Sequence, residues 1–263
     1  MRKNILSDSL VGLVLGFLYL PITVLIIFSF NQSRSRSLWT GFTLDWYIKL
    51  FQNQIIIKSL INTFIIAVIA SIIATIIGTA AAIGINSMNK FLKSSIMSVT
   101  YLSVINPEIV TGVSLMLLFS FLKFEFGFTT LILAHITFNI PYVILNVLPK
   151  VRQVNKYLYD AAMDLGCNPF SAFIKVIIPE IMPGIVAGFL MALTFSFDDF
   201  IISYFTSGPT SQTLPIVIFS MTRRRVSPEI NALSTIVFIT ILTVLMVTNL
   251  RRKKIKKNNK RYF

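Results

Sequence analysis

Hydrophobic residues run through this sequence in long stretches that few charged residues interrupt. Six of these stretches are long enough to cross a hydrocarbon core of about 30 Å as helices. They lie near residues 9–30, 59–85, 96–122, 127–148, 182–206 and 230–250. Apolar runs of this length are typical of membrane spans. The pattern therefore predicts an all-α membrane protein with six transmembrane helices.

The composition supports the same class. Hydrophobic residues make up 55% of the 263 residues and charged residues only 13%, whereas ordinary soluble domains contain roughly 25% charged residues. The first run follows Arg2 and Lys3, as the apolar core of a signal peptide would. However, it lacks a small-x-small cleavage site before Asn31, so we expect a retained anchor.

We divide the chain into three parts. Residues 1–58 form an N-terminal anchor helix and an extracellular loop, 59–250 form one transmembrane domain, and 251–263 form a basic tail. Within the second run, small residues recur at intervals of three and four, which predicts a face for close helix packing. These residues are Ala67, Ser71, Ala74, Gly78 and Ala82.

The placement of Lys and Arg predicts the orientation. If both termini are cytoplasmic, 16 of the 24 basic residues fall on the inner side, as the positive-inside rule requires. The tail 251–263 supplies much of the net charge of +14. We expect this tail to touch anionic membrane lipid rather than nucleic acid.

Several kinds of catalytic or cofactor site are excluded. A single cysteine, Cys167, rules out a disulfide within the chain and multi-cysteine metal sites, and a single histidine, His135, rules out histidine clusters. The sequence has no GxxxxGK[ST] and no GxGxxG, so it does not bind ATP by those motifs. We therefore expect no cofactor and no enzymatic activity on this chain.

Three acidic residues lie inside predicted spans, where each carboxylate costs about 2.5–3.5 kcal/mol to insert. Glu108 lies near the centre of the third span, and Asp198 and Asp199 lie in the fifth. The spans contain no Lys or Arg well inside them. A path for anions would show the opposite sign of charge, so these residues predict a cationic substrate.

A continuous fifth helix would separate the two aspartates. At about 100° per residue, Ser196, Asp199 and Ser203 would form one polar stripe, and Asp198 would point elsewhere. We expect Asp199, with Ser196 and Ser203, to line the path, and Asp198 to pair with a neighbouring helix or with the backbone. A wide cavity would admit both acids. We expect Glu108 to line the path too. For Asp199 and Glu108, the alternative is a structural partnership with a polar group on another helix, and for Asp198 it is a place on the path.

His135 and Asn139 lie one helical turn apart in the fourth span. Polar side chains in membrane helices commonly hydrogen-bond to neighbouring helices, and that is the role we expect here. The alternative is that both side chains line the cavity.

The longest inner segment, 149–181, is amphipathic rather than continuously apolar. Four apolar residues share one face of a short helix: Leu158, Ala161, Ala162 and Leu165. Gly166 is placed to end this helix, and Asn168 with Pro169 to begin a second one. The segment therefore predicts two short helices joined by a sharp turn. They either rest on the membrane surface or dock into a groove on a soluble partner.

The same segment resembles the EAA loop of ABC importer permeases. Its "DAAMDLG", followed by nine residues and "VIIP", reproduces the spacing of that loop, with Asp160 in place of the family's glutamate. The resemblance implies a type I ABC importer permease fold whose coupling helix fits a separate ATP-binding subunit, which would hold ATP and Mg²⁺. The implied coupling residues are Asp160, Ala161, Ala162, Leu165, Gly166 and Pro179.

Further stretches are similar to PotC-type spermidine/putrescine permeases, among them "NPEIVTGVSL", "AHITFNIPYVI" and "SFDDFIISYFTSGP". The resemblance implies a polyamine importer of the bacterial cell membrane that works by alternating access. It also implies an ATPase dimer, a second homologous permease and an extracellular or periplasmic binding protein as partners.

Two alternatives remain open at this stage. The first is the same kind of machine for iron or another small solute, since related permeases share the EAA loop. The second is a cation channel or an intramembrane enzyme that uses the two aspartates. Adjacent residues on one helix diverge by about 100°, which disfavours a paired catalytic site, and a channel would leave the amphipathic loop without a purpose.

Overall fold

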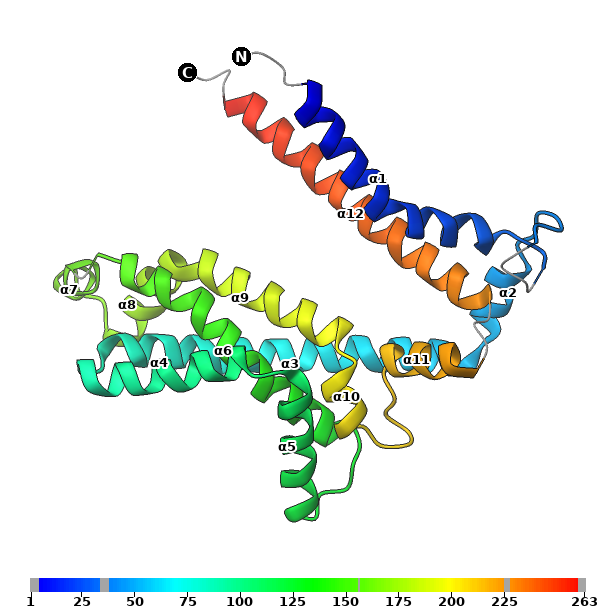
Figure 1. Cartoon of the computed structure of the whole chain (residues 1–263). Helices are drawn as coiled ribbons and strands as arrows, with labels where there is room; N and C mark the ends of the chain where they lie inside the picture. Colours follow the sequence, from blue (N-terminus) through cyan, green and yellow to red (C-terminus); the bar gives the residue numbers. More distant parts are fainter. Residues whose placement is uncertain (1–4, 34–37, 156, 225–227, 260–263) are drawn as a thin grey trace. The chain divides into compact units, whose positions relative to one another are not determined.

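The computed structural model of the chain is almost entirely helical (Figure 1). It describes residues 5–33, 38–155, 157–224 and 228–259. The chain forms two compact units: Met1–Ile57 together with Ile218–Phe263, and Lys58–Val217. The predicted division at residues 58/59 and 250/251 stays a prediction.

The first unit is built on two long helices and one short one. They are α1 (Ile5–Ser29), α2 (Asp45–Gln52) and α12 (Pro228–Asn259). Both α1 and α2 pack against α12. The backbone oxygen of Asn31 accepts a hydrogen bond of 2.7 Å from the indole N–H of Trp46, and the amide of Asn53 donates to Glu229 at 3.2 Å. These bonds order the segments that connect the helices of this unit.

The second unit holds the central bundle. Its helices are α3 (Gln54–Ser87), whose first residues belong to the first unit, α4 (Lys90–Ile105), α5 (Glu108–Phe121), α6 (Phe128–Gln153), α7 (Tyr157–Asp164), α8 (Pro169–Ala172), the π-helix η1 (Phe173–Ile177), α9 (Ile178–Asp198) and α10 (Ile201–Thr206). Helix α11 (Leu214–Arg224) is divided between the two units. Helix α6 is central, since α4, α5, α9 and α10 all pack against it.

Close approach of α6 to its neighbours depends on glycine. The predicted small-residue face of α3 is buried throughout: Ala67, Ser71, Ala74, Gly78 and Ala82. A Cβ atom at Gly78 would lie 2.7 Å from Cβ of Val143 on α6, and one at Gly188 on α9 would lie 3.2 Å from Cγ1 of the same valine. Val143 thus fits between two glycines, which confirms that this face of α3 is a helix-packing surface.

Four helical segments are long and apolar enough to cross a membrane: Ser9–Ser29, Gln54–Ser87, Phe128–Gln153 and Pro169–Asp198. A fifth span results if the bent pair α4 and α5 counts as one. These segments agree with five of the six predicted spans. The sixth, 230–250, lies within α12, where many side chains are outside the described residues.

Two predicted spans are broken, so the expectation of continuous helices was wrong for them. The third span, 96–122, bends by 106° between α4 and α5. Asn106 is extended there, because the residue before a proline is disfavoured in the helical region. The fifth span, 182–206, breaks at Asp199, which is also extended. Sequence periodicity did not reveal this second break, because no proline or glycine marks it.

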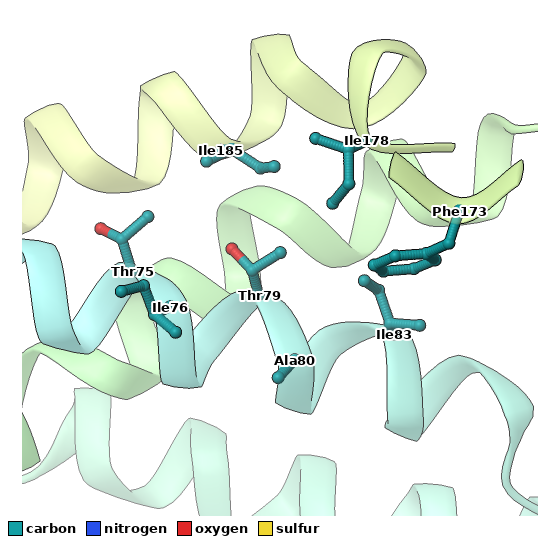
Figure 2. A pocket seen from close by; sticks show the side chains of 8 residues that line it. All are labelled: Thr75, Ile76, Thr79, Ala80, Ile83, Phe173, Ile178 and Ile185. Atoms are coloured by element: carbon teal, nitrogen blue, oxygen red, sulfur yellow. The ribbon is translucent and has the colours of Figure 1, made fainter. Parts of the chain in front are cut away.

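The amphipathic segment also differs from the prediction in one respect. The second short helix is not separate, because α8 continues through η1 into α9 and the fifth span begins near Pro169. A cavity of about 340 Å³ lies beside η1 (Figure 2). Phe173 and Ile178 face α3 across it, and the α3 wall includes Thr79, whose hydroxyl has no hydrogen-bond partner among the described residues.

Candidate functional site

Two helix breaks meet at the centre of the second unit and bring acidic residues together. The first break places Glu108 at the start of α5, directly after Pro107. The Glu108 side chain is exposed, and no hydrogen bond to its carboxylate is found within the described ranges. Broken membrane helices are where transporters commonly build substrate sites, since their ends supply polar groups at depth.

The second break separates the two adjacent aspartates. Asp198 is the last residue of α9 and is exposed, whereas Asp199 lies in the extended link before α10 and is buried. Helix α5 packs closely against α10. A Cβ atom at Gly112 on α5 would lie 3.1 Å from the ring of Phe205 on α10. This close packing of α5 on α10 brings the two breaks together.

The Asp199 carboxylate is stabilised entirely by its own chain. One oxygen accepts from the backbone N–H of Ile202 at 3.2 Å and the other from that of Ser203 at 2.7 Å. A carboxylate in this position satisfies free N–H groups at the start of α10 and interacts favourably with the helix dipole. His135 Nε2 lies 3.6 Å from the second oxygen. Asp199 therefore caps a helix from a buried position.

His135 and Asn139 join α6 to the two pieces of the broken span. His135 Nε2 and the Ser203 hydroxyl are 3.0 Å apart, and the Asn139 amide donates to the Ser196 hydroxyl at 2.6 Å. All four side chains are buried. The expected interhelical hydrogen bonds of His135 and Asn139 are confirmed, and Ser196 and Ser203 are their partners.

Glu108 and Asp198 are not compensated in this way. The charge of Glu108 interacts with those of Asp199 and Asp198, so three like charges share one region. Across the described ranges, the only contact within 4 Å between these acids and a basic side chain is that of Asp199 with His135. The region therefore carries excess negative charge on its exposed side, where Glu108 and Asp198 lie.

An aromatic cluster borders the acidic region. The ring of Tyr142 on α6 lies 4.6 Å from that of Phe195 on α9, edge to face at 65°, and Phe138 packs against both rings. The charge of Glu108 interacts with the Tyr142 hydroxyl. Sequence reasoning missed Tyr142, although its position one turn after Asn139 on α6 was an available signal. Faces of aromatic rings attract cations.

The environments of Asp198 and Asp199 are thus the reverse of those that we expected. Asp199 is buried in a capping role, and Asp198 is exposed beside Glu108, because the helix ends between them and the predicted stripe assumed continuity. Ser196 and Ser203 are near Asp199, as expected, but they bond to α6. The path roles of all five residues remain predictions.

The predicted turn of the coupling segment forms as expected. Gly166 has φ +89°; its N–H donates to the Met163 oxygen at 2.9 Å, and that of Cys167 to the Ala162 oxygen at 3.1 Å. This pair of bonds is a Schellman motif, which ends helices at a glycine. The side chain of Asn168 then caps α8 by accepting from the Ser171 N–H at 2.7 Å.

The apolar residues of this segment divide into two groups. Ala162 is buried, and α7 packs on α8 and η1. In contrast, Leu165 is 87% exposed, Tyr157 76% and Phe170 73%. Asp160 and Ala161 are exposed too. The face predicted from these residues is thus buried at Ala162, where α7 packs on α8 and η1, and exposed at Ala161 and Leu165. Its docking role stays a prediction.

Comparisons with known proteins define the class of this chain. It belongs to the family of binding-protein-dependent transport system inner membrane components, whose profile matches residues 74–256. The chain is accordingly a membrane transport component that crosses the membrane several times.

The chain is also similar to individual polyamine permeases. It is 34% identical to the spermidine/putrescine transport system permease protein PotC of Haemophilus influenzae, over 97% of this chain and 99% of the relative. It is 37% identical to the putrescine transport system permease protein PotI of Escherichia coli, over 87% and 84%. The resemblance seen in the sequence is confirmed.

Solved structures confirm the fold of ABC importer permeases. A bacterial ABC transporter involved in the import of the acidic polysaccharide alginate matches with a TM-score of 0.71 and 17% identity, over 96% of both chains. An amino acid ABC transporter matches with a TM-score of 0.55 and 22% identity, over 80% of this chain and 99% of that one.

Proposed function

We propose that this chain is the permease subunit of an ATP-driven polyamine importer. The observation that carries the proposal is the pair of exposed carboxylates, Glu108 and Asp198, at two meeting helix breaks without a cationic partner among the described residues. The names of its relatives, PotC and PotI, give spermidine and putrescine as the class of substrate.

The charges explain why a polyamine suits this region. Carboxylates away from bulk water need a counter-charge, and Asp199 obtains its stabilisation from backbone N–H groups. Among the described residues, the Glu108 carboxylate has no hydrogen-bond donor and that of Asp198 has only its own backbone N–H, so a substrate ammonium is the natural partner for each. Tyr142 and Phe195 add aromatic surface beside them, which contacts ammonium groups and the methylene chain favourably.

The coupling segment supports action by alternating access. Tyr157, Leu165 and Phe170 are exposed large apolar side chains, and such side chains on a short helix can enter a groove on a partner. ATP closure of a separate ATPase dimer, which would hold ATP and Mg²⁺, would move α7 and reorient the bundle. Asp160, Ala161 and Pro179 belong to this coupling segment by resemblance.

Two further partners follow from the same proposal. A second homologous permease supplies the other wall of the path, where the acidic region is open. A binding protein delivers the polyamine from outside, and the alginate transporter, solved in complex with a periplasmic protein, offers a parallel. In this proposal, the protein lies in the plasma or inner membrane of a bacterium, with both termini in the cytoplasm.

Reconstitution tests the substrate. The permease pair, the ATPase and the binding protein in vesicles should hydrolyse ATP faster when spermidine or putrescine is added, and the labelled polyamine should enter. If neither polyamine stimulates hydrolysis or competes for uptake, the polyamine assignment fails and the permease assignment survives. Iron and other small cations, tested in the same vesicles, are the competing substrates.

A further inference from the structure

A groove between α4 and α6 lies apart from the acidic region. It has a volume of about 280 Å³ and is lined by Lys90, Lys93, Ser94, Met97, Tyr101 and Arg152. Lys90 and Lys93 come from the first turn of α4, and Arg152 from the last turn of α6. The groove therefore lies between the start of α4 and the end of α6, and the chain passes from that end of α6 into α7 (Figure 1).

Three cations converge at one end of this groove without acidic partners. Lys93 makes a contact of 3.4 Å to the amide oxygen of Asn86, which leaves its charge uncompensated. Within the described part of the chain, neither Lys90 nor Arg152 has an Asp or Glu at ion-pair distance. Like charges repel one another, so an anion bound at this end of the groove would relieve that repulsion.

The other end of the groove is apolar. Met97, which lines it, is buried, and Tyr101, one turn further along α4, is 51% exposed. Tyr101 lies eleven positions after Lys90 on α4, which is about 16 Å along the helix at 1.5 Å per residue. The cations of the groove lie at the helix ends, where a lipid headgroup would be, and its apolar surface runs along the helices, where an acyl chain would be. The groove therefore matches a phospholipid of one leaflet.

We propose that this groove is a binding site for an anionic phospholipid. Its phosphate-bearing headgroup would lie among Lys90, Lys93 and Arg152, and an acyl chain would follow Met97 toward Tyr101. Basic pockets between membrane helices on the cytoplasmic side recognise such headgroups. The apolar end distinguishes a lipid from free phosphate, which would leave Met97 and Tyr101 without contacts.

The position of the groove gives the lipid a consequence for transport. Helix α4 leads directly to the break that carries Glu108, and α6 leads to α7. A headgroup that bridges α4 and α6 therefore holds together the elements that we assign to substrate and to coupling. Anionic lipid should raise the substrate-stimulated ATPase rate; this consequence rests on the proposed function, whereas lipid binding does not.

Lipid binding by the complete importer tests the site directly. The assembled complex, in vesicles of phosphatidylcholine with phosphatidylglycerol, is extracted and examined by native mass spectrometry for retained phosphatidylglycerol. Replacing Lys90 and Arg152 by Gln should weaken retention by about fivefold for each cation removed, as expected for basic side chains beside anionic lipid. Lys58→Gln, an exposed lysine in the first turns of α3, is the matched control and should retain the lipid.

Four results would overturn the proposal. The first is unchanged retention in the double variant Lys90→Gln/Arg152→Gln, and the second is an equal loss in Lys58→Gln. The third is displacement of the lipid by inorganic phosphate alone, which would make the groove a site for a soluble anion. Loss of the ATPase subunit from the double variant in pure phosphatidylcholine would likewise assign the groove to a protein contact. Retention restored by Lys90→Arg with Arg152→Lys would support the proposal.

Discussion

Two adjacent acids in an apolar stretch are accommodated by different means. Asp199 is buried, but its two oxygens accept hydrogen bonds from backbone N–H groups of α10. Its charge is therefore stabilised within the chain. Asp198, one residue earlier, is exposed at the end of α9 beside Glu108. The difference arises because the helix ends between them. Only Asp198 is left to interact with something outside the chain.

Parallel substitutions of the two aspartates separate these roles. Asp198→Asn should reduce uptake of labelled spermidine by roughly tenfold to a hundredfold, the effect of losing a charged hydrogen bond of about 1.5–3 kcal/mol, with little change in the unfolding temperature. Asp199→Asn should instead lower stability by about 1–3 kcal/mol, because one buried N–H of α10 loses its acceptor.

The measurements are uptake in vesicles and thermal unfolding of the purified complex. Glu108→Gln should resemble Asp198→Asn in both. If Asp199→Asn abolishes uptake and leaves the unfolding temperature unchanged, the result would contradict the capping role. It would support the prediction from a continuous helix that Asp199 lines the substrate path.

At the scale of elements, the short segments around the breaks and turns govern the site. Pro107 interrupts one span and Asp199 the other, and the pieces α5 and α10 pack on each other. At the coupling end, a Schellman motif at Gly166 fixes the exit of the chain from α7. These turns set the directions of helices that carry the exposed groups.

Gly166→Ala should lower coupling through backbone strain alone. A Cβ atom at Gly166 would meet no atom within 4 Å, but φ is +89°, a conformation that costs an ordinary residue about 1–2 kcal/mol. Gly84→Ala on α3 is the matched control, since its Cβ also meets nothing and its backbone is helical. We expect reduced retention of the ATPase subunit and less polyamine-stimulated hydrolysis only in Gly166→Ala. Equal retention in both variants would contradict the coupling role.

At the scale of the whole molecule, orientation in the membrane connects the sites to their partners. By the proposed function, the amphipathic segment faces the compartment that contains the ATPase, and the Lys and Arg bias predicts that both termini lie on that side. The lone Cys167 lies in the turn after α7 and is partly exposed. It is therefore a natural reporter of orientation.

A membrane-impermeant maleimide should label Cys167 in inverted vesicles and not in sealed right-side-out cells. A Cys167→Ser/Lys123→Cys variant, with the new thiol in the exposed turn after α5, should show the reverse. Labelling is read by the mass shift of the purified chain. Labelling of Cys167 from outside would overturn the predicted orientation and, with it, the assignment of α7 to coupling.

The sequence by itself determined the class of the protein. Run length, small-residue spacing and Gly166 with Asn168 are local signals, because each depends on residues a few positions apart. They predicted the spans, the packing face of α3 and the coupling turn, and the structure confirms the packing face, the turn and up to five of the spans. The sign of the substrate charge likewise follows from which residues are present, and it stays a prediction.

Only the tertiary structure decided which acid is exposed. The break at Asp199 is stabilised by contacts among α6, α9 and α10, namely the His135 and Asn139 bonds, and such contacts between distant residues leave no periodic signal. The same holds for Tyr142 beside Glu108 and for the basic groove between α4 and α6. A local sequence pattern predicts a helix and its ends. The pairing of charges across helices depends instead on how the whole chain packs.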